Sequence, residues 1–227
     1  MKREIITTGD GSKTIQISEW DEQYHSKHGA IQEARHVFLG MGLQHYVSKM
    51  PTTQPIAILE MGFGTGLNAL LTLFEAQALN TEIEYTGIEA YPVSEEEVAA
   101  MDYSSQLTQT NALQYYNQMQ SLSWGEQHPI TTDYRLTKRQ ERFENITDIG
   151  LYDLVYFDAF GARVQPELWD EAIFEKMYIA LRENGVLVTY AAKGSVRRAM
   201  QAVGFVVERL PGPPGKREML RATKTCN

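Results

Sequence analysis

The segment Ile56–Asn68 constrains the fold of this chain more than any other. A short apolar run ends in Glu60, three glycines follow at alternate positions, and leucines then recur at helical spacing. This order predicts a buried strand, a tight turn and a helix. Glycines let the backbone turn sharply and let a ligand approach the main chain, while the start of a helix presents unpaired N–H groups. We therefore expect a nucleotide-type cofactor site at the carboxyl edge of a parallel sheet.

The residues of this turn distinguish among the known glycine-rich sites. A phosphate-binding P-loop ends in Gly-Lys-Ser/Thr, which this segment lacks, and the dinucleotide pattern requires a glycine where this chain has Leu67. The order Glu-x-Gly-x-Gly-x-Gly instead resembles the first motif of class I S-adenosylmethionine (SAM) methyltransferases. The cofactor-binding candidates in this segment are Glu60, Gly62, Phe63, Gly64, Gly66 and Asn68.

A second acid supports a nucleoside-type cofactor. The run 82–88 is typical of a strand, and Glu89 follows it directly. An acid at the end of the second strand of such a unit is placed to accept hydrogen bonds from ribose hydroxyls. Glu60 and Glu89 each end a strand and are joined by a helix, which fits both SAM and dinucleotide sites.

Apolar runs alternate with helical patterns along the rest of the chain, at residues 152–158, 186–190, 205–209 and 218–222. Strands that alternate with helices indicate a parallel, doubly wound α/β sheet. The last two runs are joined by too few residues for a crossover, so they pair antiparallel. The predicted fold is a class I SAM-dependent methyltransferase (Rossmann-like) sheet, mostly parallel with an antiparallel final strand, plus a small N-terminal arm.

The N-terminal region shows a different pattern. Gly-Asp-Gly at residues 9–11 separates two β-prone runs and suggests a hairpin. Residues 31–50 predict one helix, or two short helices broken near Gly40 and Gly42. We expect residues 1–50 to form an N-terminal arm and helix that cover the active site, and residues 51–227 to form the SAM-dependent methyltransferase domain.

Composition limits the classes of function. No apolar run is long enough to span a membrane, and the N-terminus lacks the apolar region of a signal peptide. The single cysteine, Cys226, suits a cytoplasmic protein. The acidic run Glu95–Glu97 follows a proline and indicates a helix start, so no metal site is predicted. A formal charge of −8 favours a small-molecule substrate over a nucleic acid, unless a local basic patch exists.

Such a patch is predicted at the carboxyl edge of the sheet. In a parallel sheet the loops after Glu60, Glu89, Asp158 and Tyr190 share one edge, which the turn at residues 211–215 also reaches. A basic rim there would suit a polyanionic substrate, although each cation taken alone is better explained as a solvated surface charge. The candidates gathered at this edge are Asp158, Phe160, Arg163, Lys193, Lys216 and Arg217.

Asp158 is the predicted catalytic residue, because it ends a buried strand at this edge. Methyl transfer from a sulfonium requires a neutral nucleophile, and a primary alkylamine, with a pKa near the value of about 10.4 for lysine, is mostly protonated at neutral pH. A carboxylate beside the amine can orient it and accept its proton. Phe160 and Trp169 could stack on a base or belong to the core.

Five motifs carry a family resemblance: Gln32–Phe38, Glu60–Asn68, Phe157–Phe160 with Pro166–Trp169, Thr189–Arg198 and Gly215–Leu220. Together they resemble the MnmC-like (MnmD) tRNA methyltransferases, which methylate 5-aminomethyl-(2-thio)uridine at the wobble position. The resemblance implies SAM as the methyl donor, 5-methylaminomethyl-(2-thio)uridine as the product and the tRNA anticodon stem-loop as the partner, with no DNA and no membrane. It also implies functional coupling to the enzymes that make the aminomethyl intermediate.

The resemblance further implies roles for single residues. Asp158 would be the catalytic carboxylate, Glu60 and Glu89 would hold the cofactor, and the stretch from Tyr24 to Gly29 would cover the active site. Two features depart from the family. Several relatives continue into an FAD-dependent oxidoreductase domain, so this chain is expected to be a stand-alone form. Relatives carry Gly-Asp after the strand near Leu136, and the Asp contacts the adenine. This chain has Lys138-Arg139-Gln140 at that place.

Two other functions are consistent with the sequence. The acidic charge favours a class I methyltransferase that acts on a small amine or hydroxyl compound. A SAM-type fold that holds RNA without catalysing a reaction is the second alternative, and the presence of the cofactor glycines and Asp158 opposes it.

Overall fold

The computed structural model describes residues 2–50 and 54–225. The predicted domain boundary at residue 51 and the single cysteine, Cys226, lie outside the described residues. Within the described residues, no helix is both long and apolar enough to cross a membrane.

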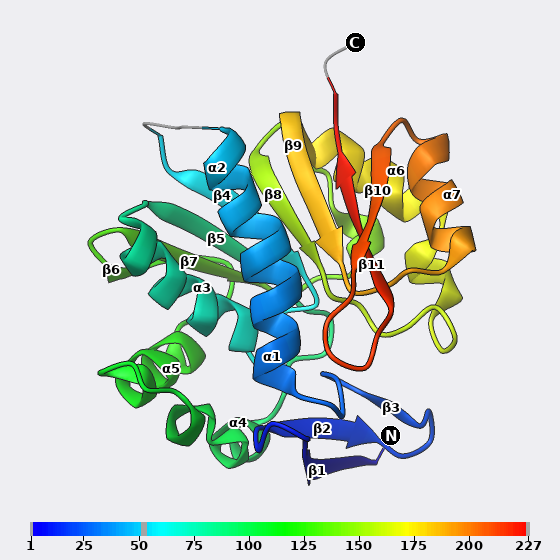
Figure 1. Cartoon of the computed structure of the whole chain (residues 1–227). Helices are drawn as coiled ribbons and strands as arrows, with labels where there is room; N and C mark the ends of the chain where they lie inside the picture. The colour runs from blue at the N-terminus through cyan, green and yellow to red at the C-terminus, as the bar shows by residue number, and fades with distance from the viewer. Residues whose placement is uncertain (1, 51–53, 226–227) are drawn as a thin grey trace.

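A twisted eight-stranded sheet forms the centre of the molecule (Figure 1), with the order β10-β11-β9-β8-β4-β5-β7-β6. Strands β4, β5, β7, β8 and β9 are parallel, whereas β11 runs antiparallel to both β9 and β10. This confirms the predicted Rossmann-like sheet with an antiparallel final strand. The strands are β4 (Ile56–Met61), β5 (Ile83–Ile88), β6 (Gln127–Thr131), β7 (Tyr134–Arg139), β8 (Tyr152–Phe157), β9 (Leu181–Thr189), β10 (Val206–Pro211) and β11 (Glu218–Thr223).

Helices cover both faces of the sheet, which is why the central strands are apolar on both sides. Every residue of β4 and β8 is buried. One apolar cluster joins the sheet to α3 and the helix that begins at Ala30, and a second joins it to α6 and α7. The helices after β4 are α3 (Leu67–Leu79), α4 (Glu95–Met101), α5 (Ala112–Ser121), α6 (Glu171–Ala180) and α7 (Gly194–Ala202), with short 3₁₀ turns η2 (Tyr103–Gln106), η3 (Phe143–Asn145) and η4 (Pro166–Trp169).

Residues Ala30–Lys49 form one continuous helix, which confirms the first of the two predicted alternatives. Its middle, η1 (Arg35–Gln44), has π-helical hydrogen bonding between α1 (Ala30–Ala34) and α2 (His45–Lys49). Gly42 lies against the sheet, where an added Cβ would come within 3.0 Å of Val188. The glycine therefore permits close packing on the sheet instead of breaking the helix.

Strand β6 was not predicted from the sequence. It pairs antiparallel with β7 at the edge of the sheet, with a register shift between Pro129 and Thr131. The segment is mostly polar and contains a proline, so it lacks the apolar pattern that marks the other strands. Proline is tolerated in an edge strand because its missing N–H can face solvent.

The N-terminal arm (residues 2–29) forms a small separate sheet, β1 (Arg3–Thr7), β2 (Lys13–Ile17) and β3 (Glu22–Gln23), with the predicted hairpin between β1 and β2. This sheet lies across the carboxyl ends of the central strands (Figure 1). Arg3 joins it to α4 through an ion pair of 2.9 Å with Glu97. The arm is thereby placed over the edge where the sequence predicts the site.

Candidate active site

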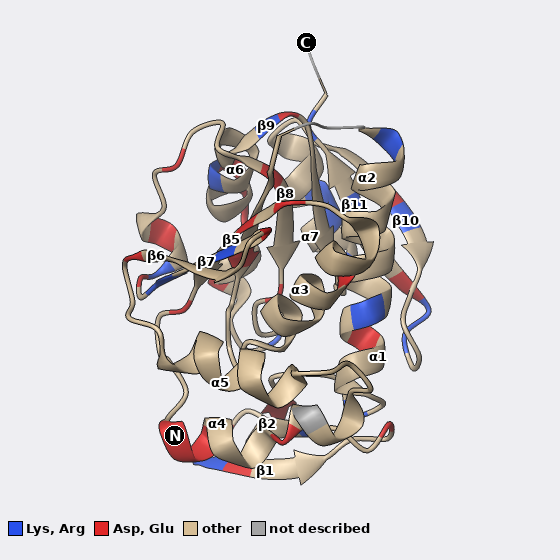
Figure 2. Ribbon diagram, turned by 90° about the vertical axis from the view of Figure 1, so that its left-hand side faces the viewer, with Lys and Arg blue, Asp and Glu red and all other residues tan. Residues whose placement is uncertain are grey.

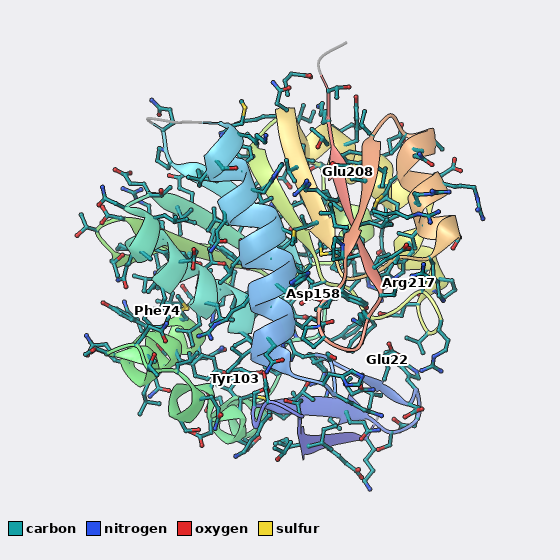
Figure 3. The ribbon with its side chains drawn as sticks, in the orientation of Figure 1. Glu22, Phe74, Tyr103, Asp158, Glu208 and Arg217 are labelled. Carbon is teal, nitrogen blue, oxygen red and sulfur yellow. The ribbon has the colours of Figure 1, made fainter. Side chains whose placement is uncertain are left out.

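A cleft of about 990 Å³ opens between the carboxyl edge of the sheet and the N-terminal arm. The glycine turn, the loops after β5, β7, β8 and β9, the arm and the β10–β11 hairpin all contribute residues to its lining. Figure 3 shows Asp158 at this end of the sheet, above the arm. Cofactor and substrate pockets commonly occupy this position in open α/β sheets.

The glycine turn forms the floor of the cleft. Gly62 and Gly64 line it and have φ values of 98° and 52°, in the left-handed region. A Cβ on Gly62 would lie 2.7 Å from the carbonyl oxygen of Asp158, and one on Gly64 would lie 3.1 Å from the Tyr24 ring. Phe63 and Asn68 also line the cleft, but Gly66 does not. Gly66 instead precedes α3 and accommodates its first turn with a φ of 78°.

Two backbone N–H groups hold the Glu89 carboxylate so that it faces the cleft. Its two carboxylate oxygens accept hydrogen bonds from the N–H groups of Gly64 at 3.0 Å and Tyr91 at 2.9 Å. The side chain lines the cleft at the end of β5. Its remaining lone pairs are therefore in position for a pair of hydroxyl groups, as the sequence predicts.

Asn68 connects two acids beneath the cleft. Its Nδ2 donates to Glu60 Oε1 at 2.8 Å and to Asp158 Oδ2 at 2.9 Å. Glu60 is fully buried and lies outside the cleft lining. Burial, followed by the charges of Asp158 and Glu89, holds the pKa of Glu60 well above its ordinary range. Glu60 thus lies beneath the cleft and joins it through Asn68, and its role in holding the cofactor stays a prediction.

Asp158 faces the cleft from the end of β8. Burial, and after it the negative charge of Glu33, raises the pKa of Asp158 to about 7. The hydrogen bond from Asn68 and the charge of Lys216 act in the opposite direction. A carboxylate with this pKa is matched to proton transfer near neutral pH.

Lys216 reaches the cleft from the tip of the β10–β11 hairpin. Its Nζ donates to Glu33 Oε1 at 2.5 Å and lies 3.8 Å from the centre of the Tyr190 ring. Glu33, on α1, is buried, and its other oxygen accepts a hydrogen bond from the N–H of Ser26 at 2.9 Å. The hairpin is anchored by a 2.8 Å hydrogen bond between His36 Nε2 and the Pro211 carbonyl.

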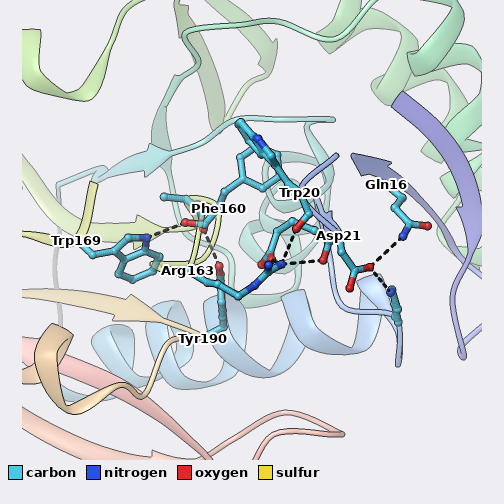
Figure 4. Close-up of polar contacts among 10 residues, drawn as sticks. Gln16, Trp20, Asp21, Phe160, Arg163, Trp169 and Tyr190 are labelled. Carbon is cyan, nitrogen blue, oxygen red and sulfur yellow. Dashed lines mark hydrogen bonds and ion pairs between the residues drawn. The ribbon is translucent and has the colours of Figure 1, made fainter. Parts of the chain in front are cut away.

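Aromatic residues of the arm cover the cleft. The rings of Tyr24 and Phe160 are 5.0 Å apart, and the ring of Trp20 is 5.7 Å from that of Phe160. Arg163 fixes the arm at this point, because its Nη2 donates to the carbonyls of Trp20 and Asp21 (Figure 4). Both Tyr24 and Phe160 line the cleft, as expected of residues that contact the substrate.

Three of the predicted basic candidates lie outside the cleft lining. Arg163 is turned towards the arm, Lys193 lines a separate hollow beside α7, and Arg217 is exposed further out on the hairpin. Loop residues share an edge because of topology, but their side-chain directions are set by local packing. Of the four predicted cations, only Lys216 therefore lines the cleft, and a rim formed by the other three around its mouth stays a prediction.

The cleft lining is acidic. Among the described residues, six carboxylates line it against four Lys or Arg side chains: Glu22, Glu33, Glu89, Glu144, Asp158 and Glu167 against Arg3, Lys27, Arg142 and Lys216. Figure 2 shows both signs of charge side by side where α1 continues into η1, and on the hairpin. An acidic cleft favours cationic groups, such as a sulfonium or an ammonium.

Several residues of the site were not predicted. Glu33 lies within a motif that the sequence identifies, but its side-chain direction depends on how α1 packs. Arg142 and Phe143 follow β7 and line the cleft, which the rule for parallel strand ends could have indicated.

Trp169 is buried in the core, where its Nε1 donates to the Phe160 carbonyl at 2.7 Å.

The position of the expected adenine-contacting acid is occupied by a buried lysine. Lys138 Nζ donates to the Gln120 carbonyl at 2.8 Å and lies outside the cleft lining. Burial lowers its pKa to about 8. No group of three or more His, Cys, Asp or Glu residues in the described part of the chain is arranged to hold a metal ion.

A family model described as S-adenosyl-L-methionine-dependent methyltransferase matches residues 102–225, more than half of the chain. The chain therefore belongs to this methyltransferase family. Its sequence is 31% identical over 219 residues to the tRNA 5-methylaminomethyl-2-thiouridine biosynthesis bifunctional protein MnmC of Polaromonas naphthalenivorans (strain CJ2), covering 88% of this chain and 32% of the relative. MnmC of Idiomarina loihiensis is 30% identical over 224 residues, covering 88% of this chain and 35% of the relative.

These matches confirm the MnmC-like resemblance, although the chain spans about a third of the length of these curated relatives. Two solved structures support the fold. MNMC2 from Aquifex aeolicus has a TM-score of 0.74 at 23% identity, covering 100% of this chain and 72% of that chain. Spermidine synthase from Thermotoga maritima has a TM-score of 0.59 at 12% identity, covering 99% of this chain and 69% of that chain. At these identities the likeness establishes the Rossmann-like fold.

SAM is the cofactor of this family, and the cleft has features that fit it. Gly62 and Gly64 line the cleft with left-handed backbone conformations, so the turn presents main-chain atoms to it. Glu89 presents a carboxylate at the position that suits ribose hydroxyls. Asn68 Oδ1 is buried and has no hydrogen-bond partner among the described residues, which leaves an acceptor for a donor group of the ligand.

Proposed function

We propose that this chain methylates the amino nitrogen of 5-aminomethyl-(2-thio)uridine at the tRNA wobble position, with SAM as the donor, giving 5-methylaminomethyl-(2-thio)uridine. One observation carries the chemistry of this proposal. Asp158, a carboxylate with a pKa raised to about 7, faces a cleft beside the glycine turn of a SAM-dependent methyltransferase. The printed function of the relatives, which concerns tRNA 5-methylaminomethyl-2-thiouridine, supports the choice of substrate.

Asp158 acts as the general base. In its ionised form it accepts a proton from the substrate ammonium, which leaves a neutral amine and a carboxylic acid. SAM, held by the glycine turn and Glu89, would supply an electrophilic methyl group to this neutral amine. Asn68 holds the Asp158 carboxylate in place throughout, through the 2.9 Å hydrogen bond to Oδ2.

The remaining site residues bind the cofactor and the RNA. Gly62, Phe63, Gly64, Asn68 and Glu89 bind the cofactor directly, and Gly66 and Glu60 shape the turn from below. Tyr24 and Phe160 enclose the uridine, and the rims of the cleft contact the anticodon stem-loop through Lys216 and the cations outside the lining, Arg163, Lys193 and Arg217. Residues 1–50 serve as the cover of this site and residues 51–227 as the methyltransferase domain. The reaction takes place in the cytoplasm and is coupled to the enzymes that make the aminomethyl intermediate.

The test is methyl transfer from labelled SAM to tRNA that carries 5-aminomethyl-(2-thio)uridine, with tRNA that carries unmodified uridine as the control substrate. The Asp158→Asn variant is expected to lose about 10²- to 10⁴-fold in turnover, as general bases do, while it still binds SAM in calorimetry. Glu175→Gln, a change in an exposed acid on α6, serves as the matched control and keeps full activity. Full activity of Asp158→Asn would remove this residue from the chemistry.

The acidic lining of the cleft favours a second candidate function, the methylation of a small amine or hydroxyl compound. Salt distinguishes the two. Activity on tRNA falls steeply as ionic strength rises, because phosphate contacts release counterions, whereas activity on a small neutral compound is nearly independent of salt. Transfer to free small amines without transfer to aminomethylated tRNA would establish the second candidate.

A further inference from the structure

The charged groups around Lys216 form a site that the proposed contact of Lys216 with RNA does not explain. Its ammonium group, a primary amine on a CH₂ carbon, is enclosed by three partners within the cleft. It donates to Glu33 Oε1 at 2.5 Å, lies 3.8 Å from the Tyr190 ring centre, and is close enough to Asp158 to lower the pKa of that residue. Two carboxylates and an aromatic face are the groups that recognise an alkylammonium ion.

The position of Glu33 requires a cation. The side chain is buried on α1, and its second oxygen already accepts the N–H of Ser26 at 2.9 Å. Removing the partner of a buried carboxylate leaves an uncompensated charge and is strongly unfavourable. Glu33 also faces Asp158, a second acid, so a cation between them offsets their mutual repulsion. Another ammonium could replace that of Lys216 without changing the charge balance.

The side chain of Lys216 can move out of the site that it forms with Glu33 and Tyr190. Its side chain is about one-third exposed and extends from the hairpin tip, whereas Glu33 and Tyr190 belong to the helix and the sheet. Gly215, next to it, has a φ of 83°. The long side chain of lysine can rotate out of the cleft without movement of the elements that hold the acids.

We propose that Glu33, Tyr190 and Asp158 form the recognition site for the substrate's alkylammonium group, and that Lys216 occupies this site in the free protein and is exchanged for the substrate. This inference deepens the proposed function and rests on it for the identity of the amine. Glu33 binds the incoming ammonium, and Asp158 accepts its proton. The substrate ammonium carries the same charge as that of Lys216, so the exchange leaves the charge balance around Asp158 unchanged until the proton is transferred.

The exchange predicts opposite effects for the two members of the ion pair. The probe is n-propylamine, protonated at pH 7, with binding measured by ligand-observed NMR. Lys216→Met removes the internal competitor and is expected to tighten amine binding about three- to tenfold, whereas Glu33→Gln removes a charged partner and weakens it about tenfold. The matched control is the exposed Arg209–Glu218 pair at 3.8 Å, where Arg209→Met leaves amine binding unchanged.

A pH profile distinguishes recognition from a merely structural role. The titratable and charged groups that face Asp158 are Glu33 from α1, Glu60 from β4, Tyr190 after β9 and Lys216 from the hairpin, with Glu22 of β3 beyond Tyr190. Glu33→Gln is expected to move the acidic limb of the pH–rate profile to lower pH, and Lys216→Met to move it to higher pH. Glu33→Asp, which keeps the charge, restores most of the amine binding.

Amine binding that is unchanged or weaker in Lys216→Met would overturn the exchange, and unchanged binding in Glu33→Gln would overturn the recognition site. Thermal unfolding of each variant checks that the fold is retained. The binding assay does not depend on methyl transfer. Failure to methylate tRNA, together with the expected amine-binding pattern, would therefore contradict the proposed function and leave the amine site standing.

Discussion

Replacing Asp158 with asparagine is expected to stabilise the fold while it removes activity. The raised pKa of Asp158, about 7 against an ordinary 3.8, means that the folded protein binds this proton more tightly than the unfolded chain does. Between about pH 4 and pH 7 the unfolded chain loses the proton while the folded protein keeps it. The free energy of unfolding that this group contributes therefore falls as pH rises through this window, and it levels off above pH 7.

The magnitude follows from the same values. The difference between 3.8 and about 7 sets a ceiling of about 4 kcal/mol for the destabilisation by ionised Asp158 at pH 8. The side chain is partly open to the cleft, and solvent screening reduces the effect to about 1–2 kcal/mol. Asparagine has nearly the same shape and its side-chain oxygen can still accept the hydrogen bond from Asn68, so little of this gain is lost.

Urea unfolding at pH 5 and pH 8 measures the effect. Asp158→Asn is expected to exceed the wild type by about 1–2 kcal/mol at pH 8 and by less at pH 5, where the ionisation of the unfolded chain has contributed only part of the effect. Glu175→Gln, at an exposed position, controls for the loss of one acid and gives the same difference at both pH values. A variant that is equally or less stable than the wild type at pH 8 would refute the reasoning.

Three further outcomes are expected. Gly62→Ala is expected to cost about 3 kcal/mol of unfolding free energy and to weaken SAM binding, because φ is 98° and the new Cβ would lie 2.7 Å from a carbonyl oxygen. The control Gly150→Ala, where φ is 58° and the surrounding space is open, is expected to cost about 1 kcal/mol in the same urea assay. Arg163→Ala speeds hydrogen exchange at residues 20–24 but changes global stability by less than about 1 kcal/mol, because the guanidinium is exposed and fixes only the arm. Burial lowers the pKa of Lys138 to about 8 in the folded protein, so the unfolded chain binds this proton more tightly. The wild type is therefore expected to gain stability relative to Lys138→Met as pH rises from about 8 to 10, and urea unfolding at these two pH values measures the gain.

The sequence predicts those parts of the site that depend on strand order. The glycine turn, Glu89 and Asp158 each follow a buried apolar run, and a parallel sheet brings all such positions to one edge. Their side chains then need to extend only a short distance to reach the cleft. The antiparallel final pair could be predicted because the connection between its strands is too short for a crossover.

Features that depend on how whole elements dock could not be predicted in this way. Glu33 faces Asp158 because α1 crosses the sheet at a particular rotation, and the π-helical segment that follows has no clear sequence signal. Arg163 belongs to the predicted edge, but the carbonyls of the arm draw it away from the cleft. Strand β6 is a polar edge strand, so no alternation of apolar residues marks it.

The position of β11 has a consequence for the order in which the protein folds during synthesis. This strand follows β10 in the chain but lies between β9 and β10, and β10 has no ladder with β9. Strand β10 therefore cannot join the sheet until the residues after it have emerged, and the two strands dock as one hairpin. Because Lys216 lies in the turn of that hairpin, its ion pair with Glu33 forms only at this late step. Closure of the sheet and completion of the cleft are thus a single event, and a chain arrested before it would display an unpaired strand edge to the cell's quality control.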